Sequence, residues 1–269
     1  MLAQPPPRVA VRPPYLAFGT PGALRATVGD LAAQPGWTRM DQALPVLLYP
    51  RLRVRAVAYP GATAVHQPVL DVTGHTRSGA VTWSAQLRTG IPDEALLAFR
   101  DALTALLDIN PPHPEGDHPA RDLLLNAGWT PYLDALDPDE QTCGVGSPDG
   151  MADFAHPITS PDDPDPQFWR FSAGVPGQMW SASLSRDAPV PLVTALAQAM
   201  ATTAPAIRDR AGLRPPLPDL APYLHLTTPA PGDRVVAATA HGTAPTRAAA
   251  PAAAVRPPPP PRPAVIHRH

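Results

Sequence analysis

Two stretches of the chain carry the hydrophobic spacing of folded structure, and the first runs from about residue 20 to residue 108. The helical spacing of its first apolar residues predicts a helix near Pro21–Ala33, which Gly36 ends. A helix is also expected over Pro92–Leu107, because proline suits a first turn, Asp93 and Glu94 complement the helix dipole, and an apolar stripe follows. Runs of branched and aromatic residues between the helices predict four strands, at Val46–Tyr49, Leu52–Tyr59, Val69–Thr73 and Val81–Arg88.

The second stretch, after a proline-rich connection, repeats this order of elements. Helices are expected near Ala120–Ala127, before Gly128, and near Val190–Ala204. Between them the pattern predicts strands near Trp129–Leu133, Gln141–Gly146, Met151–His156, Phe168–Ala173 and Gln178–Ser185.

Short tryptophan motifs recur in the same order in both stretches. Gly36-Trp37-Thr38 returns as Gly128-Trp129-Thr130, and Trp83-Ser84-Ala85 returns as Trp180-Ser181-Ala182. Each Trp-Ser-Ala is followed at equal distance by a proline that opens a predicted helix. A repeat of this length indicates a duplicated domain. The predicted fold is therefore α+β, with two tandem α-β-β-β-β-α repeats whose small antiparallel sheets are covered by helices.

The composition sets the boundaries of these repeats. The 41 prolines crowd the N-terminus, the connection near residues 108–119, the run 156–166 and everything after residue 205. We expect a proline-rich segment at 1–19, repeats at 20–108 and 119–210 joined by a linker at 109–118, and a Pro/Ala/Arg-rich tail at 211–269 that is mostly disordered. Leu217–Leu226 is the part of the tail expected to pack as an extended strap on the second repeat.

Charge is segregated along the chain. All 21 basic residues are arginine, which fits a GC-rich coding sequence better than a need for guanidinium groups. Residues 109–205 carry three arginines and thirteen acidic residues, whereas residues 206–269 carry eight arginines and three acidic residues. This arrangement favours self-association or a solvating role over nucleic-acid binding, which needs a concentrated basic surface.

A single cysteine, Cys143, excludes an intrachain disulfide framework and favours a reducing compartment. No apolar stretch reaches the length of a membrane span, and the N-terminus lacks the pattern of a signal peptide. The expected location is the cytoplasm, without membrane association.

Several of these motifs resemble one known family. The motifs are the Gly-Trp opening, the proline-started helix, the Ser147-Pro148-Asp149-Gly150 turn, Phe168-Trp169-Arg170 and Trp180-Ser181-Ala182. Together they resemble the SPDY-motif domain, an actinobacterial, mainly streptomycete, family of unknown function that usually occurs in two tandem copies. The resemblance covers about Leu31–Leu107 and Asp122–Arg208. The first copy is degenerate, with Tyr49-Pro50-Arg51-Leu52 at the motif position, and Gly150 stands where the motif has tyrosine. The family implies no activity, cofactor or catalytic residue.

Five residues are candidates for binding. Arg51, Arg53 and Arg55 are expected to place three guanidinium groups on one strand face, suited to phosphates or acidic side chains. A solvated strand face would show the same pattern. Asp149 belongs to a segment whose residue types also suit a simple turn, and Trp169 suits either a stacking platform or a core edge.

Metal and catalytic patterns are weak. His113-Pro114-Glu115-Gly116-Asp117-His118 holds four ligand types without a scaffold, and Asp162, Asp163 and Asp165 lack a calcium-loop pattern. No metal, cofactor or catalytic residue is predicted, because the nucleophile-elbow, Walker and zinc-protease patterns are missing. Gly144-Val145-Gly146 lacks the rest of a dinucleotide loop.

Three functions remain open. The leading hypothesis is a non-enzymatic module that binds another protein. The alternative is a nucleic-acid-binding protein that uses the arginine stripe and the basic tail. The third is an unrecognised enzyme in which Asp149, Asp153 and His156 come together in a cleft.

Overall fold

The computed structural model describes residues 7–41, 44–51, 53–62, 67–109, 119–134, 142–157, 168–210, 213 and 218–229. The chain divides into a unit over Met1–Ala238, which holds every described residue, and a second unit over Thr239–His269. Of the predicted linker at 109–118, residues 110–118 lie outside the described residues, as does the tail beyond Pro229.

The described chain is mixed α+β with antiparallel sheets and four α-helices, as the pattern predicts. The first half contains α1 (Pro21–Ala33), β2 (Thr38–Asp41), β3 (Pro45–Tyr49), β4 (Val54–Ala58), β5 (Pro68–His75), β6 (Val81–Arg88) and α2 (Asp93–Ile109). The second half contains α3 (Pro119–Asn126), β7 (Thr130–Asp134), β8 (Thr142–Gly146), β9 (Ala152–Pro157), β10 (Phe168–Val175), β11 (Gln178–Ser185) and α4 (Val190–Ala201). Within these two halves, the hydrophobic pattern missed strand β2, because Thr-Arg-Met-Asp carries no apolar alternation.

The strands form one ten-stranded sheet instead of two small ones. Its order is β2-β3-β4-β5-β6-β11-β10-β9-β8-β7, so the last strand of each half lies at the centre. There β6 and β11 pair antiparallel, with Ala85 opposite Leu184 and Leu87 opposite Ala182. Both strands thus present the same Ala-x-Leu segment in opposite directions, and each large side chain faces a small one. The pair Gln86 and Ser183 lies between them.

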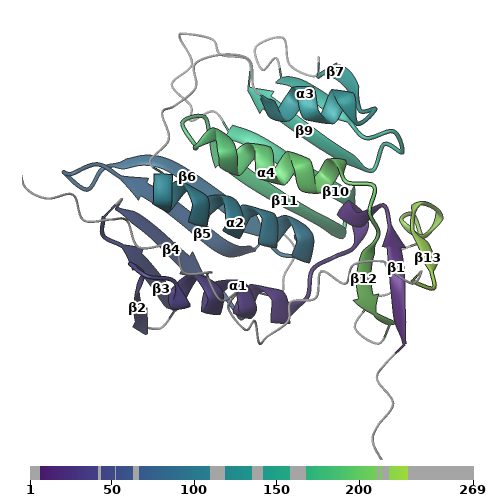
Figure 1. Ribbon diagram of the computed structural model, residues 1–269. Coiled ribbons are helices and arrows are strands. Elements are labelled where there is room, and N and C mark those ends of the chain that lie inside the picture. Colours follow the sequence, from purple (N-terminus) through teal and green to yellow (C-terminus); the bar gives the residue numbers. More distant parts are fainter. Residues whose placement is uncertain are drawn as a thin grey trace, which may run out of the picture. The chain divides into compact units, whose positions relative to one another are not determined.

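All four helices cover the same face of this sheet. Figure 1 shows α1, α2, α4 and α3 side by side across it, and neighbouring helices in that order contact one another. Alternate strand residues fill the space beneath the helices, and the largest fully buried side chains of the core include Trp180, Phe99, Phe154, Phe171, Leu87 and Leu184. The result is a two-layer arrangement in which one sheet face packs and the other carries no described helix.

The chain segments outside the two halves form a second, smaller sheet. Strand β1 (Arg8–Arg12) pairs with β12 (Ala206–Asp209) on one side and with β13 (His225–Thr227) on the other. The expected N-terminal segment therefore contains a strand whose Val9, Ala10 and Val11 are buried. A short alternation of this kind becomes a strand only when partners from a distant part of the chain reach it. The expected strap pairs with β1 through its end.

The first residues also anchor the second half. The 3-10 helix η1 (Pro14–Leu16) is buried, and the Tyr15 ring packs edge-on against Trp129, with 5.9 Å between ring centroids. The indole N–H of Trp180 donates to the Tyr15 carbonyl over 2.8 Å. The side-chain donor of Trp180, a residue of the second half, is thus satisfied by the N-terminal segment.

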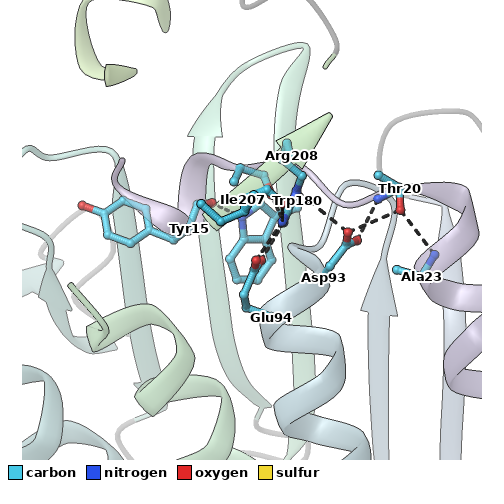
Figure 2. Close-up of polar contacts among 9 residues, drawn as sticks. Tyr15, Thr20, Ala23, Asp93, Glu94, Trp180, Ile207 and Arg208 are labelled. Carbon is cyan, nitrogen blue, oxygen red and sulfur yellow. Dashed lines mark hydrogen bonds and ion pairs between the residues drawn. The ribbon is translucent and has the colours of Figure 1, made fainter. Parts of the chain in front are cut away.

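A buried ion cluster joins β12 to the start of α2 (Figure 2). The Arg208 guanidinium, only 5% exposed, donates to both oxygens of Glu94 over 2.7 and 2.6 Å, and also to the Ala17 carbonyl. Asp93 lies 3.8 Å from the Arg208 Nε and accepts from the Thr20 backbone N–H over 2.8 Å. Burial alone would lower the pKa of Arg208, but the hydrogen bonds and charge of Glu94 raise it. Burial raises the pKa of Asp93 against the opposing charge of Arg208.

Arg208→Met is expected to destabilise the fold by about 3–5 kcal/mol, because it leaves two buried carboxylates without their cation. Urea unfolding followed by circular dichroism measures this. Arg8→Met is the matched control, since its ion pair with Asp209 is half exposed and contributes about 0–1 kcal/mol. Adding Glu94→Met to Arg208→Met is expected to recover part of the loss. Equal effects of Arg208→Met and Arg8→Met would contradict a stabilising role for the buried cluster.

Candidate functional site

The sheet face turned away from the helices carries a row of cross-strand neighbours that spans all ten strands. We call this surface the open face. From β7 to β2 the row reads Tyr132, Gly144, Ala155, Arg170, Ser183, Gln86, Asp71, Val57, Val46 and Met40. The polar residues lie in the middle of the row, around the junction of β6 and β11. Apolar and small residues flank them.

A hollow of about 580 Å³ lies on this face beside the β6–β11 junction. Its polar lining consists of two arginines (Arg88, Arg170), three serines (Ser172, Ser181, Ser183), Tyr132 and Asp153. We refer to it as the polar hollow. Its floor is the sheet itself, and Phe168 forms part of its apolar lining.

The local sequence explains how the polar hollow is built. On β10, Arg170 and Ser172 alternate with the core residues Phe171 and Ala173. On β11, Ser181 and Ser183 alternate in the same way with Trp180, Ala182 and Leu184. Successive strand residues point to opposite faces of the sheet. Since Phe171, Ala173, Trp180, Ala182 and Leu184 face the core, the polar residues between them face the open face.

Asp153 is the half-buried acidic group of the polar hollow. The Ser172 hydroxyl donates to its Oδ1 over 2.6 Å, as expected for the directly paired residues of β9 and β10. Burial raises the pKa of Asp153 above its usual value, and the hydrogen bond from Ser172 opposes this only in part. Ionised Asp153 therefore costs folding free energy.

The two arginines of the polar hollow differ in their hydrogen bonds and exposure. The Arg88 Nε–H donates to the Gln86 Oε1 over 3.0 Å, which orients its guanidinium. Arg170 is exposed. Neither forms an ion pair with any carboxylate in the part of the chain that the structure describes, so both charges remain available to a ligand.

The three arginines singled out from the sequence do not form a stripe. Strand β4 begins at Val54, so Arg51 and Arg53 lie in the turn before it, and only Arg55 lies on the strand. Arg53 adopts φ of 52°, a left-handed conformation that belongs to a turn and not to a strand. The prediction of one arginine-bearing strand face is wrong at these two positions, because the chain reverses direction there.

Asp149 acts within the turn that contains it. Its Oδ1 accepts from the Ser147 hydroxyl over 2.6 Å and from the Met151 backbone N–H over 3.0 Å. Its Oδ2 accepts from the Tyr15 hydroxyl over 2.8 Å. Burial raises the pKa of Tyr15, and the hydrogen bond to Asp149 adds to this effect, so the phenol stays neutral. The turn thus fastens the N-terminal segment to the second half.

Trp169, Asp149 and Asp153 each have separate partners and do not form one site. The Trp169 ring stacks on Phe154 of the core, with 5.9 Å between centroids, and its indole N–H donates to the Arg186 carbonyl. Asp149 binds Tyr15 and Ser147, whereas Asp153 binds Ser172 on the open face. The side chain of His156 lies outside the described residues.

The remaining sequence candidates fall on strands or outside the described residues. Gly144-Val145-Gly146 lies within β8, and the side chain of Cys143 on the same strand is not described. The segments His113–His118 and Asp162–Asp165 and the C-terminal histidines lie outside the described residues. Among the residues that are described, no three His, Cys, Asp or Glu side chains gather closely enough to hold a metal ion.

A second and larger cavity, of about 1200 Å³, lies between α2 and α4. Its two carboxylates, Glu94 and Asp101, are already paired with Arg208 and Arg100. The rest of its lining is mainly small residues of the two helices and the segment before β12. This cavity therefore offers less chemistry than the polar hollow.

Comparison with known proteins bears on part of the chain. Residues 146–206, from the end of β8 to the start of β12, match the family model of the SPDY domain, a domain of unknown function (DUF317). No curated protein and no solved structure matches the chain. Within the described residues, no helix is long and apolar enough to span a membrane.

The polar hollow was missed at the sequence level. The alternation of Arg170 and Ser172, and of Ser181 and Ser183, with core residues was a usable signal, since it marks the polar side of two adjacent strands. No sequence signal places Arg88 beside them, because β6 and β11 are about a hundred residues apart and meet only in the folded chain.

Asp153→Asn is expected to stabilise the fold at neutral pH and to have no such effect in acid. Because the pKa of Asp153 is higher in the folded chain than in the unfolded chain, wild-type stability falls as pH rises through the folded-state pKa, whereas asparagine does not titrate. Unfolding free energies measured between about pH 3 and about pH 8 test this. Asp187→Asn, in the exposed turn after β11, is the control and is expected to change stability by less than ~0.5 kcal/mol throughout. A stability difference between Asp153→Asn and wild type that does not grow with pH would contradict a raised pKa of Asp153 in the folded chain.

Proposed function

We propose that the chain is a non-enzymatic binding protein made of two tandem SPDY-like α+β repeats, at 20–108 and 119–210, which holds a partner protein on its open face. The observation that carries this proposal is the polar hollow beside the β6–β11 junction. Its two arginines have no ion-pair partner among the described residues. A rigid sheet with unpaired charges on one face suits recognition, because little ordering is needed on binding.

The tandem arrangement is supported by three features of the described chain. The order of elements, one helix, five strands and one helix, occurs twice. The Trp-Ser-Ala motifs lie on β6 and β11, the two strands that pair at the centre of the sheet. In the register of this pair, Ala85 lies opposite Leu184 and Leu87 lies opposite Ala182. A pseudo-twofold axis between Gln86 and Ser183 would give this arrangement.

A binding role is favoured over catalysis by the partners of the polar groups. Asp149 and Ser147 satisfy one another within a turn that also holds Tyr15. The Ser172 hydroxyl donates to the Asp153 carboxylate, and the described hydrogen bonds place no histidine at Ser172, as a serine nucleophile activated by histidine would need. Groups used in this way hold the fold or orient a ligand.

Nucleic-acid binding is the second candidate and rests on the arginines of the open face. Arg55, Arg88 and Arg170 lie there, but Asp71 and Asp153 lie on the same face. Mixed charge of this kind suits a protein surface better than a phosphate backbone, which favours a concentrated basic surface. We further propose a cytoplasmic location, since a single cysteine suits a reducing compartment.

Arg170→Glu in the full-length chain is expected to abolish partner capture, because it reverses a charge at the centre of the open face. Crosslinking in cells that produce the protein, followed by affinity purification and quantitative mass spectrometry, measures this. The expected result is a partner enriched by the wild type and lost about tenfold or more with Arg170→Glu. Arg186→Glu, in the exposed turn after β11, is the matched control and should retain the partner.

Two results would overturn the proposal. One is a set of partners that does not change between wild type, Arg170→Glu and Arg186→Glu. The other is tight binding of DNA or RNA by the purified chain, with an affinity that falls steeply as salt increases, which would favour the nucleic-acid alternative.

A further inference from the structure

The polar hollow holds more positive than negative charge. Arg88 and Arg170 line it together with a single carboxylate, that of Asp153. Asp153 is not within ion-pair distance of either arginine among the described contacts. The hollow thus holds two positive charges and at most one negative charge. Because burial disfavours the ionised form of Asp153, the local charge is positive.

Hydrogen-bond donors surround this charge. The hydroxyls of Ser181 and Ser183 line the polar hollow and have no hydrogen-bond partner among the described residues. The Arg88 Nε–H donates to the Gln86 Oε1, which orients the guanidinium. The two terminal nitrogens of Arg88 have no partner among the described residues. A fixed guanidinium with adjacent hydroxyls matches the planar or tetrahedral oxygens of carboxylates and phosphates.

The polar hollow also limits what enters. The hollow has a volume of about 580 Å³. It opens to solvent on one side, and the sheet forms its floor. Ionised Asp153 opposes a second negative charge nearby, and its Oδ2 has no described partner, so it accepts a hydroxyl or N–H next to the anionic group. The cavity therefore fits one anionic group attached to a short polar stem.

We propose that the polar hollow is an anion-binding site that takes a single phosphate or carboxylate group displayed by the partner protein, with Arg88 and Arg170 as the charged ligands and Ser181 and Ser183 as hydroxyl donors. The display by a protein rests on the proposed function, whereas the anion site itself is a property of this chain. Asp153 weakens the binding and selects an anionic group that carries a neighbouring donor.

The test titrates isotopically labelled full-length protein with inorganic phosphate, O-phospho-L-serine and N-acetyl-L-glutamate at constant ionic strength, followed by amide NMR shifts. Saturable shifts are expected for at least one probe, gathered on residues 86–88, 170–172 and 181–183. Arg170→Gln is expected to weaken that binding about tenfold or more, since it removes a charged donor. Asp153→Asn is expected to tighten it several-fold, because it removes the opposing charge and keeps an acceptor for Ser172. Arg186→Gln is the matched control and should bind like the wild type.

The probes separate the two sources of the anion. Tighter binding of O-phospho-L-serine than of N-acetyl-L-glutamate indicates a phosphorylated partner, and the reverse order indicates an acidic side chain or a chain terminus. Shifts that do not saturate, that scatter over the chain, or that are unchanged in Arg170→Gln overturn the anion site. If the anion site fails while Arg170→Glu still loses its partner, the proposed function stands without it. If the probes bind but no partner depends on Arg170, the proposed function fails and the anion site remains.

Discussion

The pairing of β6 with β11 is the constraint on which the rest of the structure depends. Ala85 faces Leu184 and Leu87 faces Ala182, so each buried leucine lies opposite a small residue beneath the helices. Backbone pairing at this place removes two strand edges that would otherwise be exposed. It also turns two five-stranded layers into one sheet, brings α2 and α4 into contact, and creates the open face with its polar hollow. Arg88 reaches the serines of β11 only because of this junction.

The ends of the described chain reinforce the same arrangement from outside the sheet. Residues before α1 supply β1 and η1, and the segment after α4 supplies β12. Tyr15 contacts the Ser147–Gly150 turn and Trp180, while Arg208 ties β12 to the first turn of α2. These contacts join residues that are far apart in sequence, so they link the two halves outside the ten-stranded sheet.

The polar residues divide into those that hold the fold and those that face outward. The Asp149 turn and the cluster of Arg208, Asp93 and Glu94 are consumed by internal contacts. On the open face, Arg88 and Arg170 have no ion pair among the described residues, and Arg88 donates its Nε–H to Gln86. Most of the lining of the polar hollow belongs to the second half, which is also the half that matches the SPDY family model. Scaffold residues recur between the halves, whereas the outward polar groups differ.

The sequence by itself determined the local elements. Apolar spacing placed α1 and the two helices that follow Pro92 and Pro189, and the recurring tryptophan motifs marked β6 and β11, because periodicity and turn residues act over a few positions. It did not place β2, which carries no apolar alternation, or β1, whose partners β12 and β13 lie far along the chain. It also predicted a strand at Arg51 and Arg53, where the chain turns. Only the tertiary structure decided that the halves share one sheet and that Arg88 lies beside Ser181 and Ser183. Both features depend on the register between β6 and β11. Local sequence patterns do not encode this register, because the two strands are about a hundred residues apart.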